Sequence, residues 1–92
     1  MSLSQAWVFQ GASARFPSGI FLSREKAEQW IKINALTGIL TAYPVDIGVY
    51  DWAIARGTFT PKKEQHKSAR FRQRFTSAQQ EHYHYEAGQC AA

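Results

Sequence analysis

The seventeen residues from Tyr43 to Phe59, YPVDIGVYDWAIARGTF, constrain the fold most, because they hold a strand end, a short helix and its stop signal. Asp46 is the expected N-cap, and Gly57 is the residue expected to end the helix. At about 100° per residue, one helix face carries Ile47, Tyr50 and Ile54, and another carries Val49, Trp52 and Ala53. A helix that is apolar on two faces needs cover on both, either from its own domain or from a partner.

Composition limits how large a body this helix can join. The chain has 92 residues, 45% of them hydrophobic, with three Trp, four Tyr and six Phe. Such a chain has enough apolar surface for one core and is too short for two. We expect one globular domain over residues 1–88 and a flexible tail over residues 89–92.

Cysteine usage and hydropathy bear on location. The single Cys90 has no second cysteine to pair with, as is typical of a reducing compartment. The uncharged run at residues 33–45 is interrupted by Asn34, Gly38 and Pro44, and no basic and apolar leader opens the sequence. We expect a soluble, unanchored, cytoplasmic protein.

Strand signals occur in four places. AWVFQ is apolar on both alternations, which predicts a strand that is central or covered on two faces, and it is followed by GIFL, ILTAY and EHYHYE at residues 19–22, 39–43 and 81–86. The first two form the simplest hairpin. Strict alternation in the last run places Tyr83 and Tyr85 inward and His82, His84 and Glu86 outward.

Helix signals complete an α+β fold. The strongest covers Arg24 to Ala35, with Ser23 as N-cap and Gly38 closing it. A short third helix is predicted near Ala69 to Phe75, with Phe71 and Phe75 on its core side. We expect a small, mostly antiparallel sheet of three to four strands, on which the helices at 24–35 and 47–56 pack.

Several unusual strings together resemble a family of small uncharacterised bacterial proteins or domains. They are WVFQG, FPSGIF, EKAEQWI, LTAYPVDIGVYDWAI, GTFTPKK and RFTSAQQEHYHYEAG, and they span nearly the whole chain, from about Trp7 to Gly88. The resemblance implies a self-standing bacterial domain and lends no activity. Some small bacterial families of this size are immunity proteins beside toxins, which is an analogy of size.

Catalytic and cofactor signals are weak. Asp46 and Asp51 lie about 140° apart on a helix, so they do not converge as an acid and base pair. No nucleophile elbow or glycine-rich phosphate loop appears, so we expect no enzyme and no cofactor. His82, His84 and Glu86 share one strand face, and two imidazoles there could hold a metal ion if His66 or a carboxylate added a third ligand. A solvated strand face explains the same pattern.

The positive charge is concentrated in one segment. Residues 56–74 hold seven cations against Glu64, a balance of 7 − 1 = +6, while the remainder carries 4 − 6 = −2. These cations, flanked by Trp52, are the candidate partner-binding residues: Arg56, Lys62, Lys63, Lys67, Arg70, Arg72 and Arg74.

We expect a non-enzymatic macromolecule-binding module, a monomer or homodimer whose basic segment meets an acidic protein, with an immunity-protein-like role among the options. The alternatives are nucleic-acid binding through residues 56–74 and a metal-dependent activity at His82 and His84. Val49 and Trp52 are either buried within the domain or part of an interface.

Overall fold

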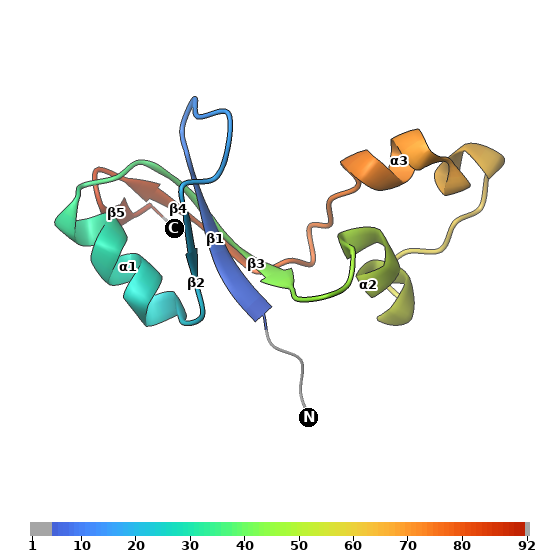
Figure 1. Ribbon diagram of the computed structural model, residues 1–92, viewed down its shortest axis with the longest axis horizontal. Helices are drawn as coiled ribbons and strands as arrows, with labels where there is room; N and C mark the ends of the chain where they lie inside the picture. Colours follow the sequence, from blue (N-terminus) through green and yellow to red (C-terminus); the bar gives the residue numbers. More distant parts are fainter. Residues whose placement is uncertain (1–4, 92) are drawn as a thin grey trace.

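A five-stranded antiparallel sheet organises residues 5–91, the part of the chain that the computed structural model describes (Figure 1). Its order is β2-β1-β3-β4-β5, and its strands are β1 (Gln5–Gly11), β2 (Gly19–Phe21), β3 (Gly38–Pro44), β4 (His82–Glu86) and β5 (Gln89–Cys90). The helices are α1 (Arg24–Ile33), α2 (Val49–Ala55) and α3 (Ala69–Arg74), with a 3-10 turn η1 (Glu64–Lys67) before α3. The α+β class is confirmed.

The predicted count of three to four strands is wrong, because Gln89 and Cys90 belong to the sheet. They pair with Glu86 and Tyr85 of β4. The connection between the two strands is two residues long, and Ala87 and Gly88 both have positive φ, 49° and 85°, as the tightest hairpin loops require. The sequence did not indicate this turn, because its first residue is Ala and not one of the residues typical of such turns. Residues 1–4 and Ala92, which the domain and tail predictions include, lie outside the described residues.

One face of the sheet is covered by α1. Trp7, Phe9, Leu40, Ala42 and Tyr85 from the strands pack with Ala27 and Ile31 of the helix, and all seven are buried. The expected hairpin of β1 and β2 is confirmed, as is the inward side of Tyr83 and Tyr85. β1 is an interior strand, between β2 and β3, and α1 covers it on one face.

The start of α1 agrees with the sequence prediction, whereas its end does not. Ser23 caps the start, since its hydroxyl accepts from the Lys26 amide at 3.2 Å. The helix ends at Ile33 with Asn34 as its C-cap. Ala35 takes the left-handed conformation with φ 52°, and the Leu36 amide donates back to the Ile31 carbonyl at 2.9 Å. The prediction that Gly38 closes this helix is wrong. Gly38 instead opens β3.

The second helix begins at a different residue from the one predicted. Asp46 has φ 68° and caps nothing, and the helix starts at Val49 after Gly48, which offers no side chain for capping. Gly57 does end it, with φ 77°, and its amide donates to the Ile54 carbonyl at 3.0 Å.

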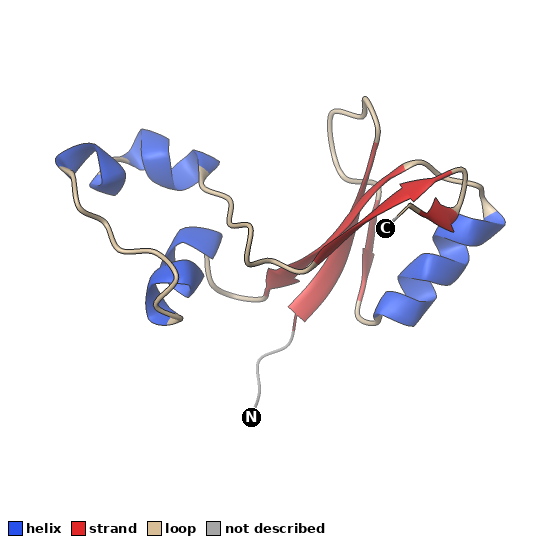
Figure 2. Cartoon of the chain, turned by 180° about the vertical axis from the view of Figure 1, so that it is seen from behind, coloured by secondary structure: helices blue, strands red, loops and turns tan. Residues whose placement is uncertain are grey.

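Residues 45–80 form a helical arm between β3 and β4 that contains α2, η1 and α3 and extends beside the sheet (Figures 1 and 2). The prediction that the second helix packs on the sheet is therefore wrong. The radius of gyration is 14.7 Å, against about 12 Å for a compact chain of this length. At the base of the arm, the buried Gln80 donates from its side-chain amide to the Ala42 carbonyl at 3.2 Å, which ties the arm to β3.

Candidate functional site

An aromatic cluster holds the helical arm together without the sheet. Tyr50 of α2 is only 4% exposed, and its ring centroid lies 5.8, 6.1 and 5.5 Å from those of Phe59, Phe71 and Phe75. Its hydroxyl donates to the His66 carbonyl at 2.8 Å, which joins α2 to η1. Phe71 and Phe75 thus lie on a core side, as their spacing predicts, but the core is that of the arm.

This cluster explains why α2 leaves the sheet. Tyr50 and Ala53 are its buried residues, whereas Ile47 and Ile54, expected in the core with Tyr50, are each 38% exposed. Three phenylalanine rings on the arm offer Tyr50 edge-on and tilted contacts of the kind that stabilise ring pairs. The helix therefore turns its tyrosine toward η1 and α3.

The cations of the basic segment all lie on the exposed surface of the arm. They are Arg56, Lys62, Lys63, Lys67, Arg70, Arg72 and Arg74. Within residues 5–91 the one ion pair joins Arg24 and Glu28 of α1, so none of the seven arm cations is paired there. The guanidinium of Arg72 lies 4.8 Å from the centre of the Tyr50 ring. The arm therefore displays a concentrated positive charge.

Trp52 lies at one side of this charge. It is half-buried, as is Val49, and the Arg56 guanidinium sits 4.8 Å from the centre of its ring. The face that the sequence left as either buried or open is thus partly covered. An indole beside an arginine has the composition of protein interface anchors.

The outward face of β4 carries the weak metal candidates. His82, His84 and Glu86 are exposed, as predicted, and the two imidazole centroids lie 5.7 Å apart. His82 Nδ1 is 2.8 Å from the Gln80 carbonyl oxygen, and His66 Nδ1 accepts from the Lys62 amide at 3.1 Å, so both rings have other partners. Among residues 5–91 no three His, Cys, Asp or Glu side chains gather closely enough to hold a metal ion.

A polar network between α1 and β4 was missed by sequence reasoning. Glu28 accepts from Arg24 Nε at 3.2 Å and from the Tyr85 hydroxyl at 2.5 Å, and the Arg24 guanidinium lies 3.7 Å from the centre of the Tyr83 ring. Burial, together with the bond to Glu28, raises the pKa of the Tyr85 hydroxyl. The contact spans 57 residues, so no local pattern could indicate it.

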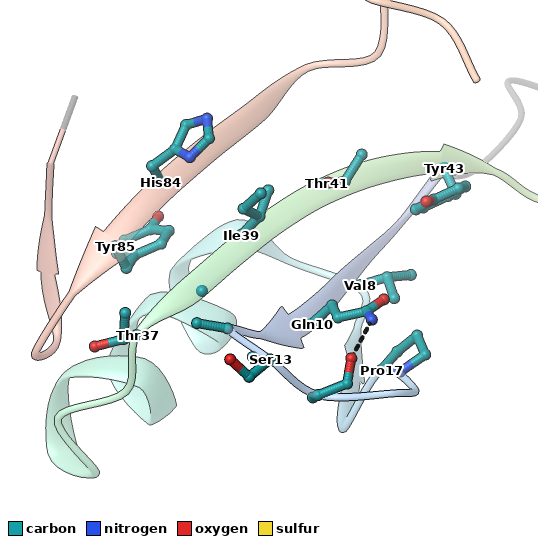
Figure 3. A pocket seen from close by; sticks show the side chains of 14 residues that line it. Val8, Gln10, Ser13, Pro17, Thr37, Ile39, Thr41, Tyr43, His84 and Tyr85 are labelled. Carbon is teal, nitrogen blue, oxygen red and sulfur yellow. Dashed lines mark hydrogen bonds between the residues drawn. The ribbon is translucent and has the colours of Figure 1, made fainter.

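The sheet face opposite α1 contains a groove of about 560 Å³. Its floor comes from β1, β3 and β4, and its wall comes from the loop 12–18 between β1 and β2 (Figure 3). Val8, Ile39 and Tyr43 supply apolar lining, and Gln10, whose side-chain amide donates to the Ala14 carbonyl at 2.9 Å, supplies polar lining. The sequence contained no motif for this groove.

Comparison with known proteins places the chain in a family. The profile of a family described as a domain of unknown function, DUF7710, matches residues 6–91. The chain belongs to this family. No curated protein and no solved structure matches it.

The DUF7710 assignment confirms the resemblance to an uncharacterised small family, and it covers the sheet, α1 and the helical arm together. The arm is therefore part of the family's unit and not an addition to it. Bacterial origin stays a prediction. In the part of the chain that the structure describes, every helix is too short or too polar to cross a bilayer.

Proposed function

We propose that this DUF7710 domain is a non-enzymatic binding module whose helical arm engages an acidic protein. The observation that carries the proposal is the set of seven exposed arm cations, unpaired within residues 5–91, on an element that extends from the sheet. Such a surface raises the local concentration and the association rate of an anionic partner. Trp52 beside Arg56 adds an aromatic anchor at its side.

The net positive charge of the domain is carried by the arm. Residues 45–80 carry seven cations against Asp46, Asp51 and Glu64, a balance of 7 − 3 = +4, while the rest of the chain carries four of each sign. A partner recognised by charge would therefore meet the arm first. An immunity-protein-like role, in which the partner is a toxin, fits this kind of surface as one case.

Nucleic acid is the second ligand class that the cations suit. Single-strand binding commonly combines cations with aromatic rings that stack on bases. Phe59, Phe71 and Phe75 are instead half-buried and packed against Tyr50, which leaves less ring surface for stacking on bases. This packing favours an acidic protein over nucleic acid.

The test compares two charge reversals of equal size. Lys62, Lys67 and Arg70 changed to Glu alter the arm, and Arg15, Lys26 and Lys32 changed to Glu alter exposed positions elsewhere by the same net charge. Capture from a lysate of the native host is followed by binding of poly-glutamate, a defined acidic polypeptide. The proposal expects the arm variant to lose both, with affinity weakened roughly 10- to 100-fold, while the control variant retains them.

Equal capture by the two variants would remove the arm from the interaction. A mobility shift with random-sequence DNA that weakens steeply as salt rises, without capture of an acidic protein, would replace the proposal with nucleic-acid binding. For the metal alternative, elemental analysis of protein purified without added metal provides the test at His82 and His84.

A further inference from the structure

A second pocket lies at the C-terminal end of α3, where the arm turns back toward β4 (Figure 1). Its volume is about 440 Å³, and its lining residues are Phe71, Arg74, Phe75 and Thr76. They belong to α3, to its C-cap and to the residue that follows the cap. The pocket is therefore part of the basic arm, and it shares no lining residue with the groove on the sheet.

Two phenylalanine side chains give this pocket an apolar wall. Phe71 and Phe75 are four residues apart, and their ring centroids lie 5.8 Å from each other. Both pack against Tyr50, yet both are only half-buried and so keep exposed surface. Apolar surface that is left in water is stabilised when another apolar group covers it. The wall therefore suits an apolar side chain of a partner.

Arg74 adds an unpaired positive charge to this wall. Two other arginines of the arm lie over rings, Arg56 over Trp52 and Arg72 over Tyr50. Arg74 is exposed, and within residues 5–91 it contacts neither a carboxylate nor the face of a ring. A guanidinium presents its donors in a planar fork that matches the two oxygens of a carboxylate. The pocket thus combines an apolar wall with a group that recognises carboxylates.

Two electrostatic effects compete at this end of α3. The last carbonyl groups of a helix carry partial negative charge, which disfavours an anion. However, α3 has only six residues, and three of them are arginines: Arg70, Arg72 and Arg74. The lining residues include no Asp or Glu. The full positive charges therefore outweigh the partial negative charge, and the pocket favours an anion.

We propose that this pocket binds an apolar side chain that stands next to a carboxylate in an acidic segment of the partner protein. The apolar side chain covers Phe71 and Phe75, and the neighbouring carboxylate pairs with Arg74. This inference rests on the proposed function, and it specifies the partner as one whose acidic segment also contains an apolar residue. A compact aliphatic side chain needs less exposed ring surface than a stacked base, so the half-buried rings favour a peptide over nucleic acid.

The test compares two fluorescein-labelled peptides of equal length and charge, Glu-Glu-Leu-Glu-Glu and Glu-Glu-Ser-Glu-Glu, by fluorescence anisotropy at one salt concentration. The leucine peptide should bind roughly 10-fold more tightly than the serine peptide, because burial of one leucine side chain supplies about that factor. In amide NMR spectra of the wild-type protein, which need no substitution, the leucine peptide should shift Phe71, Arg74 and Thr76 more than the serine peptide does.

Substitutions at the pocket have matched controls on the same arm. Thr76→Glu adds a carboxylate to the lining and should remove the preference for the leucine peptide. Thr60→Glu makes the same change of charge at an exposed position outside the lining and should keep the preference. Arg74→Gln should weaken the leucine peptide about 5-fold, whereas Lys67→Gln, which removes the same charge elsewhere, should weaken it less than about 2-fold. Circular dichroism confirms the fold of each variant.

The outcomes separate this inference from the proposed function. Equal binding of the two peptides would overturn the pocket inference and leave the proposed function in place, because charge alone would then explain the binding. If neither peptide binds but poly-glutamate does, the pocket inference again fails by itself. Absence of binding by both peptides and by poly-glutamate would remove the proposed function as well.

Two further results would also overturn the pocket inference. One is a preference for the leucine peptide that persists in folded Thr76→Glu protein, since the apolar contact would then lie elsewhere. The other is an oligothymidylate of equal charge that binds more tightly than the leucine peptide and loses its binding in Thr76→Glu. That result would make nucleic acid the ligand of the pocket.

Discussion

Tyr50 should decide whether the helical arm folds, and two substitutions separate its hydroxyl from its ring. Tyr50→Phe removes the bond to the His66 carbonyl, 2.8 Å long and part-buried, and keeps the ring contacts. We expect a cost of about 1–2 kcal/mol in the free energy that holds the arm closed, because a partly buried carbonyl loses its donor. Tyr50→Ala also removes three ring pairs and the contact with the Arg72 guanidinium.

The larger loss should open the arm and leave the sheet folded. Truncating a buried aromatic side chain costs about 3–5 kcal/mol, and the arm has no larger core to compensate, since its buried residues in α2 are Tyr50 and Ala53. The core around α1 contains neither residue. Tyr50→Ala should therefore release the arm as a local unfolding unit.

Amide hydrogen exchange measures this directly. In Tyr50→Ala the amides of Trp52 and Arg72, which bond within α2 and α3, should lose protection, while Val8 and Leu40 in the sheet keep theirs. In Tyr50→Phe the arm amides should exchange faster by roughly 5- to 30-fold. Two results would refute the reasoning. One is that neither substitution makes the arm amides exchange faster. The other is that the sheet amides lose protection together with the arm amides, which would mean that the arm is not an independent unit with its own aromatic core.

Three further predictions concern the sheet and α1. Gly38→Ala should lower the free energy of unfolding measured by urea denaturation, because an added Cβ would lie 2.3 Å from the Gln10 carbonyl oxygen, far inside contact distance. Overpacking of this kind typically costs about 1–3 kcal/mol or more. A loss below about 0.5 kcal/mol would contradict the close approach. Ala35→Gly should stabilise by about 0.5–1 kcal/mol in the same assay, because Ala35 has φ 52° and glycine adopts this conformation without strain; a decrease would show that the turn is unstrained. Because the pKa of Tyr85 is raised in the folded state, the unfolded state loses the tyrosine proton first as pH rises. The contribution of Tyr85 to the free energy of unfolding should therefore be complete below about pH 10 and fall as pH rises above it. Tyr85→Phe should flatten this fall in urea titrations, whereas Tyr43→Phe, at an exposed position, should not.

Local sequence patterns determined the elements that local physics controls. Ser23 caps α1 and Gly57 ends α2 as predicted, since a capping hydroxyl and a residue tolerant of positive φ act within one turn. The alternation in EHYHYE placed Tyr85 inward and His84 outward for the same reason. The exposed cations of residues 56–74 also follow from sequence, because charged side chains are rarely buried.

The turns showed where local patterns end. Asp46 has the chemistry of an N-cap but takes φ 68°, and the helix starts three residues later at Val49. Gly38 has the chemistry of a helix stop, yet it is needed where β3 passes close to β1. In both cases the choice between two local roles depended on neighbours distant in sequence.

Tertiary structure alone decided what each apolar face contacts. The helix around Tyr50 is apolar on two faces, which was consistent with packing on the sheet. It packs instead against Phe59, Phe71 and Phe75. The reason is that the four rings all lie in the segment between β3 and β4 and make a core of their own. The result is a basic arm beside a sheet whose second face is uncovered in residues 5–91. The sequence by itself determined that the chain is an α+β unit with a concentrated positive segment. Burial depends on contacts between residues far apart in the chain, and therefore only the fold could separate the charged surface of the arm from the buried, apolar face of the sheet under α1.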